Sequence, residues 1–187
     1  GRELMSCDWA AHYGQDIARV APSPPGVAYA QPGFVGGDYL GVAFVGQNPG
    51  VGDRPERARA SRLWDVELKK WHDEGTLGAY RNVFRFWQSD LQRWPVWSKW
   101  MAPVLNRVPL TEENIGYLNL CKNQTTANRP PTSRMYQADW YWTKRQLDAL
   151  EPKVVVAGGL AVAREIVERW PNPPFKLVSQ NRVRSQS

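Results

Sequence analysis

Short apolar runs that end in polar turns recur along the chain. The first run, residues 41–46, is near-continuously hydrophobic, which is typical of a strand buried in a parallel sheet. It ends in the tight turn Gly46–Gly50, where glycine and proline fix a sharp backbone path. Gln47 and Asn48 are the polar pair of this turn. By itself the turn is equally typical of an ordinary loop, but its position beyond a strand end is where open α/β sheets bind ligands.

Three later runs, at residues 115–120, 152–159 and 175–178, also predict strands. The first of them continues into a polar, basic turn that ends at proline, and the last continues into another basic turn. Parallel strands joined by right-handed crossovers bring their carboxyl ends to one edge of the sheet. We therefore expect one cleft, lined by Gln47, Asn48, Asn119, Lys122 and Asn181.

Helical spacing of apolar residues separates these strands. It predicts a helix over 133–150, another that opens at residue 160, and a block of helices between residues 63 and 109 that is broken at Gly75 and Gly78. Residues 1–38 are expected to form a short helix and a loop. Residues 1–187 then make a single domain, a three-layer α/β/α sandwich with a central four-stranded, mostly parallel sheet.

The charge balance favours a polyanion as partner. The net charge is +6 and the isoelectric point is about 9.5, which suits nucleic acid first. No apolar run approaches the roughly 18 residues that span a bilayer. We therefore expect single- or double-stranded DNA as partner, no membrane, and a monomer. The N-terminus has no signal-peptide pattern, so the cytoplasm is the default location.

Metal and cofactor chemistry are not expected. Cys7 and Cys121 are the only cysteines and cannot form a Cys₄ site. His12 and His72 are the only histidines, and their separation is not that of metal ligands. Ten tryptophans are a high number for this length; most suit core packing, and the alternative for some is base stacking.

Three motifs, in their order along the chain, together resemble the uracil-DNA glycosylase superfamily. The G-Q-N-P-G turn is similar to the first active-site motif of its mismatch-specific and single-strand-selective branches. The middle of the chain is similar to the iron–sulfur branch, where a strand ending in asparagine precedes a lysine-containing loop that ends in Asn-Arg-Pro. That similarity rests on Asn119, Lys122, Asn128-Arg129-Pro130 and the segment Leu150–Gly158, and the whole resemblance covers about residues 40–185.

The chain departs from this family at two places. Asn123 stands where a cluster cysteine would fall, so we expect no iron–sulfur cluster. The last motif of the family is usually His-Pro-Ser or Asn-Pro-Ser, and no histidine follows His72. Asn181 in the closing basic turn is the best substitute, which leaves the rate or the substrate open.

The resemblance implies a role for each candidate residue. Asn48 would hold the attacking water, Asn119 would read the pyrimidine edge, and Asn181 would replace the last catalytic residue. Trp64 is the candidate stacking ring, with a core position nearly as plausible. The remaining candidates line the pocket (Gln47, Pro49, Gly50) or contact phosphates (Lys122, Arg129, Arg182, Arg184).

Three functions follow as hypotheses. The first is a DNA glycosylase that flips a pyrimidine nucleotide and hydrolyses its N-glycosidic bond, acting on uracil or deaminated bases. The second is a glycosylase for bulky modified pyrimidines of foreign DNA, which the missing histidine and the arginine-rich segment 54–62 favour. That segment suits a solvated surface equally well. The third is a DNA-binding protein that keeps the fold and has lost catalysis.

Overall fold

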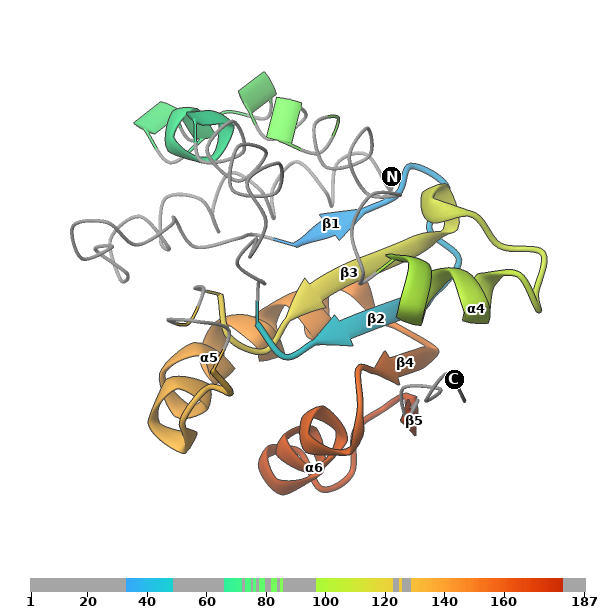
Figure 1. Ribbon diagram of the computed structural model, residues 1–187, viewed down its shortest axis with the longest axis vertical. Helices are drawn as coiled ribbons and strands as arrows, with labels where there is room; N and C mark the ends of the chain where they lie inside the picture. Colours follow the sequence, from blue (N-terminus) through green and yellow to red (C-terminus); the bar gives the residue numbers. More distant parts are fainter. Residues whose placement is uncertain are drawn as a thin grey trace, which may run out of the picture.

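The fold is built on a mixed sheet with helices packed against it. The computed structural model describes residues 33–48, 66–71, 73–74, 76, 78–79, 82–83, 85, 97–122, 125 and 129–179. Within these residues five strands form one mostly parallel sheet in the order β1-β3-β2-β4-β5 (Figure 1). The strands are β1 (Phe34–Val35), β2 (Val42–Gly46), β3 (Ile115–Asn119), β4 (Val154–Ala157) and β5 (Lys176–Ser179).

The four strands predicted from the apolar runs are confirmed, and all four are parallel to one another. The fifth strand, β1, corrects two expectations. The sheet has five strands instead of four, and Phe34–Val35, expected to lie in a loop, form a strand. Strand β1 pairs antiparallel with β3 through Phe34 and Tyr117, and Phe34 is buried. Two residues are too few to show the alternation that marks a strand, so the pattern of the sequence could not reveal it.

The helices agree with the spacing of apolar residues, with two exceptions. The predicted helix over 133–150 is α5 (Ser133–Leu150), and the helix opening at residue 160 is α6 (Leu160–Arg169). The helix expected before Pro109 is shorter: a π-helical turn, Trp97–Met101, continues into α4 (Ala102–Leu105). Gly78 was expected to break a helix and is itself helical, as are residues 66–71.

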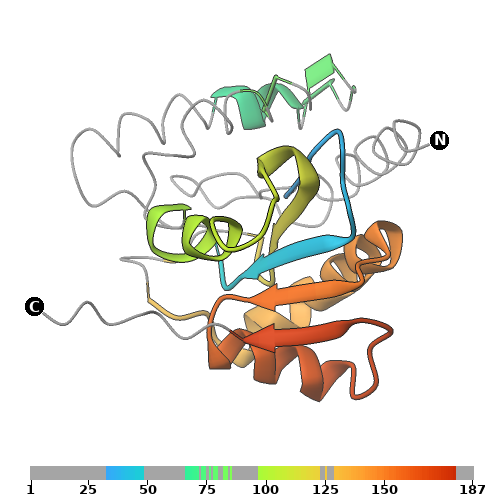
Figure 2. The ribbon, with the colours of Figure 1, turned by 90° about the vertical axis from the view of Figure 1, so that its right-hand side faces the viewer.

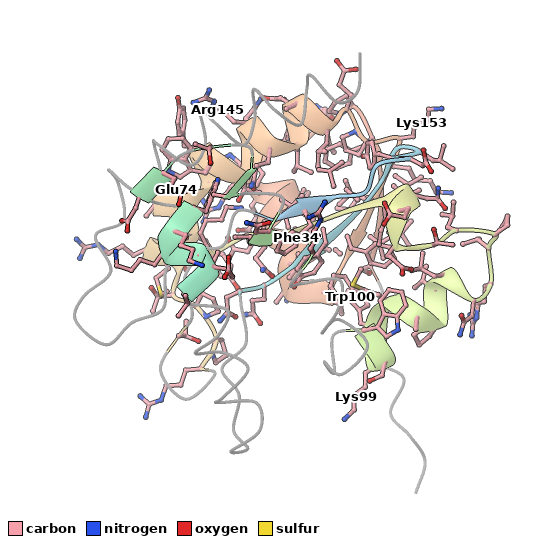
Figure 3. All side chains as sticks on the ribbon, turned by 90° about the horizontal axis from the view of Figure 1, so that it is seen from above. Phe34, Glu74, Lys99, Trp100, Arg145 and Lys153 are labelled. Carbon is pink, nitrogen blue, oxygen red and sulfur yellow. The ribbon has the colours of Figure 1, made fainter. Side chains whose placement is uncertain are left out.

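Side chains of alternate residues in each strand enter two separate cores, because neighbouring strand residues face opposite sides. Phe44 of β2 belongs to a core with Trp71 and Met101, whereas Val45 belongs to one with Leu147 and Val162. Figure 3 shows α4 and α5 on opposite sides of the strands, and Figure 2 shows α6 alongside β4 and β5. In the part of the chain described here, no helix has the length and apolar character to cross a membrane.

Candidate functional site

The parallel strands end together at one edge of the sheet. Gly46 at the end of β2 is paired with Asn119 at the end of β3, and the last residues of β4 and β5, Ala157 and Ser179, are also paired. Beyond this edge the amide of Cys121 donates to the carbonyl of Gln47 at 2.9 Å, so the first two turns remain attached to each other. The predicted convergence of strand ends is therefore confirmed for the described residues.

Asn119 brings a buried amide to this edge. The residue is only 3% exposed, and its Oδ1 accepts a hydrogen bond from the Tyr117 hydroxyl at 3.1 Å. The same oxygen lies against Gly46, so closely that a Cβ on Gly46 would overlap it. If the amide were flipped, its NH₂ group would face the Cα hydrogens of Gly46, which cannot accept a hydrogen bond. Tyr117 and Gly46 therefore both favour the orientation in which Oδ1 faces them.

The Nδ2 group of Asn119 is the part of the site that can bind a ligand. None of its described neighbours accepts a hydrogen bond from it, although almost the whole residue is buried. Among the described residues, this Nδ2 is not one of the buried polar atoms that lack a partner, so the donor stays accessible and a ligand carbonyl can accept from it. The arrangement therefore suits a planar ligand with a carbonyl oxygen at its edge, placed beyond the end of β3.

Gln47 and Asn48 are half-buried and are held by residues that follow β3 in the chain. Gln47 Nε2 donates to the Tyr136 hydroxyl of α5 at 2.8 Å. Asn48 Nδ2 donates to Thr125 Oγ1 at 3.1 Å, and this hydroxyl donates in turn to the carbonyl of Arg129. The first turn is thus oriented by side chains of the second turn and of α5, a connection that sequence reasoning did not identify.

Lys122 was expected at the surface as a phosphate contact, and the structure corrects this. The residue is only 1% exposed, and its ammonium donates to the carbonyl of Asn119 and to Gln146 Oε1, the latter at 2.6 Å. A lysine among polar turn residues is usually solvated, but here it points under β3 toward α5. Arg129, by contrast, is exposed, as a phosphate-contacting residue has to be.

Burial changes the ionisation of several groups at this edge. It lowers the pKa of Lys122 to about 7, partly offset by the nearby Asp139 carboxylate. Burial raises the pKa of Tyr117 to about 12, so the hydroxyl that binds Asn119 keeps its proton at neutral pH. It likewise raises the pKa of the free thiol of Cys121 to about 12. Burial also raises the pKa of Asp139, although its hydrogen bond from the Lys122 amide acts in the opposite direction.

Trp100 is an aromatic residue of this edge that the sequence analysis did not single out among the ten tryptophans. Its ring meets Phe44 edge-on at 5.4 Å and Tyr117 at 6.2 Å between centroids, on the α4 side of the sheet (Figure 3). A Cβ on Gly158, just beyond β4, would lie 3.2 Å from the ring. The indole therefore packs against the tyrosine that orients Asn119, and the tryptophan-rich composition was the available signal.

The remaining candidates of the sequence prediction lie outside the described residues. They are Trp64, Pro49, Gly50, Asn181, Arg182 and Arg184. Among the residues that are described, no group of three histidine, cysteine, aspartate or glutamate side chains could hold a metal ion.

Comparison with known proteins does not assign the chain to a family. A scan against protein-family models and a search of curated proteins both found no match.

Proposed function

We propose that the chain is a DNA glycosylase that takes a flipped pyrimidine nucleotide into this edge and hydrolyses its N-glycosidic bond. The observation that carries the proposal is the buried amide of Asn119, whose Nδ2 has no described acceptor, directly beside the Gln47–Asn48 turn. An amide fixed in one orientation distinguishes a carbonyl from an amino group at the edge of a base. Extruding the nucleotide costs about a few kcal/mol, which contacts in the pocket must offset.

Each residue has a defined part in the proposed reaction. Asn48 positions a water molecule, which adds to C1′ of the deoxyribose as the bond between C1′ and the base nitrogen breaks. The electron pair of that bond leaves with the base, and the proton lost by the water ends on the released base. Asn119 donates from Nδ2 to the base carbonyl, where negative charge develops. Gln47 stays fixed by Tyr136 and forms the wall of the pocket.

The proposal includes the wider setting expected from the sequence. DNA is the partner, since the net charge of +6 suits a polyanion. The helices on the two faces of the sheet complete a three-layer α/β/α sandwich. The working compartment is the cytoplasm, and the protein acts as a monomer.

A single-turnover assay tests the proposal. The substrates are oligonucleotides that contain uracil, hypoxanthine, 5-hydroxymethylpyrimidine or a glycosylated pyrimidine, and abasic sites are detected after incubation. We expect release of one of the pyrimidines, and loss of release in Asn48→Ala. Release of only the bulky modified bases would indicate that the substrate is foreign DNA that carries modified pyrimidines. Tight DNA binding with no abasic site on any substrate would refute the enzyme and leave a DNA-binding protein.

A further inference from the structure

A line of polar side chains along α5 faces the carboxyl ends of β2 and β3. They follow one another at intervals of three, four and three residues, which places them on one face of a helix. Each one bonds the backbone or a side chain of the two turns. These residues, the α5 polar stripe, are Tyr136, Asp139, Thr143 and Gln146.

Side chains of the α5 polar stripe form several hydrogen bonds with the segment around Asn119. Asp139 Oδ2 accepts from the backbone amide of Lys122 at 2.8 Å. Thr143 Oγ1 lies 3.1 Å from the carbonyl oxygen of Leu120 and 3.4 Å from that of Asn119, to which it donates. Gln146, which is fully buried, accepts from the Lys122 ammonium, and that ammonium also donates to the carbonyl of Asn119. Lys122 is therefore the link between Asn119 and the far end of the stripe.

We propose that Lys122 is a positioning residue, whose buried ammonium holds Asn119 in place and keeps a positive charge beneath the amide that meets the base. The proposal rests on the proposed function, because the group that benefits is the base leaving with negative charge. A charge shielded from water acts over several ångströms with far less screening than a surface charge. Lys122 thus acts through Asn119, without touching DNA.

The charge of Lys122 changes in the neutral range, which makes the proposal testable by pH. Its pKa is about 7. The charged and titratable groups around it are Asp139 on α5 and Cys121 in its own turn, and Cys121 also feels Glu165 and Arg169 of α6. Cys121 keeps its proton near pH 7, because burial raises the pKa of its thiol to about 12.

The first experiment follows the side-chain amide of Asn119 by NMR in the DNA-free protein as pH is raised from 5 to 9, a range of about two units either side of the expected midpoint. We expect the resonance to shift with a midpoint near 7, and the shift to disappear in Lys122→Met. In Gln146→Glu, whose added carboxylate favours the ammonium, the midpoint moves upward. A midpoint that survives in Lys122→Met, or stays unchanged in Gln146→Glu, would overturn the proposal. If Lys122→Met does not fold, Gln146→Glu decides alone.

The second experiment measures single-turnover base release and DNA binding against pH and salt. Wild-type release should fall as pH rises through 7, whereas Lys122→Met should be slower by about tenfold at pH 6 and show no such fall. Its slope of log affinity against log salt should equal that of the wild type. Arg129→Met, which removes an exposed cation of the same turn, is the matched control and should lower that slope by about one.

The two experiments separate the failure of this proposal from that of the proposed function. A salt slope lowered by about one in Lys122→Met would make Lys122 a phosphate contact and overturn the positioning role. Absence of base release by the wild type at every pH would refute the glycosylase. The NMR titration would then still decide whether Lys122 controls Asn119.

Discussion

Gly46 occupies a position where any side chain would collide with the amide assigned to base recognition. The Cβ of an alanine there would overlap Asn119 Oδ1 and lie 3.1 Å from the Tyr117 hydroxyl. Glycine is thus required at the end of β2, in the G-Q-N-P-G turn, because Asn119 at the end of the neighbouring strand β3 occupies the adjacent space. At the scale of single residues, this turn and Asn119 form one site because they share this contact.

Gly46→Ala should therefore displace the Asn119 amide. We expect a loss of about 1–3 kcal/mol in the free energy of unfolding, measured in urea, because the buried edge has no room for a methyl group. Base release should slow by about 100-fold, the effect of a displacement of about 1 Å at a reacting centre. Gly37→Ala is the control, since a Cβ there meets only Glu113 Oε2, at 3.6 Å. Equal rates for the two variants would contradict the assignment of Asn119.

The buried ammonium of Lys122 should make stability rise with pH. Its pKa in the folded protein is about 7. An unfolded lysine stays protonated to about pH 10.4, so the unfolded chain binds the extra proton between these values. The free energy of unfolding should then increase by at most about 1.4 kcal/mol per pH unit above pH 7. Above about pH 8.5 the buried Cys121 thiol opposes the increase, because the unfolded thiol loses its proton first.

Urea unfolding at pH 7, 7.5, 8 and 8.5 measures this slope, between the pKa of about 7 for folded Lys122 and the pKa of about 8.5 for an unfolded thiol. Lys122→Met should remove it. Lys153→Met, which removes an exposed lysine at the opposite end of β4 (Figure 3), should retain it. The same slope in wild type and Lys122→Met would show that Lys122 keeps its proton in the folded protein over this range, so that its pKa is not lowered to about 7.

At the scale of elements, α5 is the part that organises the site. Thr132 caps its start by accepting from the amide of Met135, and the helix ends at Glu151 in the left-handed region with φ of 44°. Between these ends one face carries the polar stripe together with the apolar Leu147. The helix therefore both closes one core and holds the two turns that carry the candidate residues.

Tyr136→Phe tests the N-terminal end of the α5 polar stripe and changes the volume of the side chain only a little. It removes the acceptor of Gln47 Nε2, so the first turn loses its attachment to α5. We expect base release to slow by about tenfold, near the value of one hydrogen bond to the turn. Tyr141→Phe is the matched control on the outer face of the same helix, where Tyr141 is 60% exposed. A tenfold loss in both variants would point to a general loss of folding.

The end of α5 offers a prediction about stability alone. Glu151 adopts a left-handed conformation that glycine tolerates without strain. Glu151→Gly should therefore raise the free energy of unfolding by roughly 0.5–1 kcal/mol, after the greater flexibility of the unfolded chain is subtracted. Glu151→Ala keeps the strained backbone and should give no such gain. Chemical denaturation of the two variants checks this, and equal stabilities would contradict it.

At the scale of the whole molecule, the hydrophobic pattern predicted the sheet better than it predicted the site. The runs at β2, β3, β4 and β5 were recognised because each is apolar over several residues, and α5 because its spacing is regular over 18 residues. The meeting of strand ends followed from parallel topology. Strand β1 was missed because it consists of only two residues.

The interior position of Lys122 could not be predicted from the pattern. Whether a lysine in a turn faces water or the protein depends on which polar groups α5 presents to it, and that depends on the rotation of the helix. Gln146 and Thr143, the two fully buried polar residues of the stripe, satisfy the end of β3 from the helix side. Their spacing in the sequence was visible, but their partners lie more than 20 residues away in the chain.

In the proposed reaction, the amide of Asn119 binds the base that is released. The most direct measurement is the single-turnover rate of uracil release from an oligonucleotide, compared among wild type, Asn119→Ala and Asn106→Ala. Asn106 is an exposed asparagine after α4 and serves as the control. We expect Asn119→Ala to lower the rate by about 100-fold or more, and Asn106→Ala to keep the wild-type rate. Uracil release at the wild-type rate by Asn119→Ala would contradict this role of Asn119.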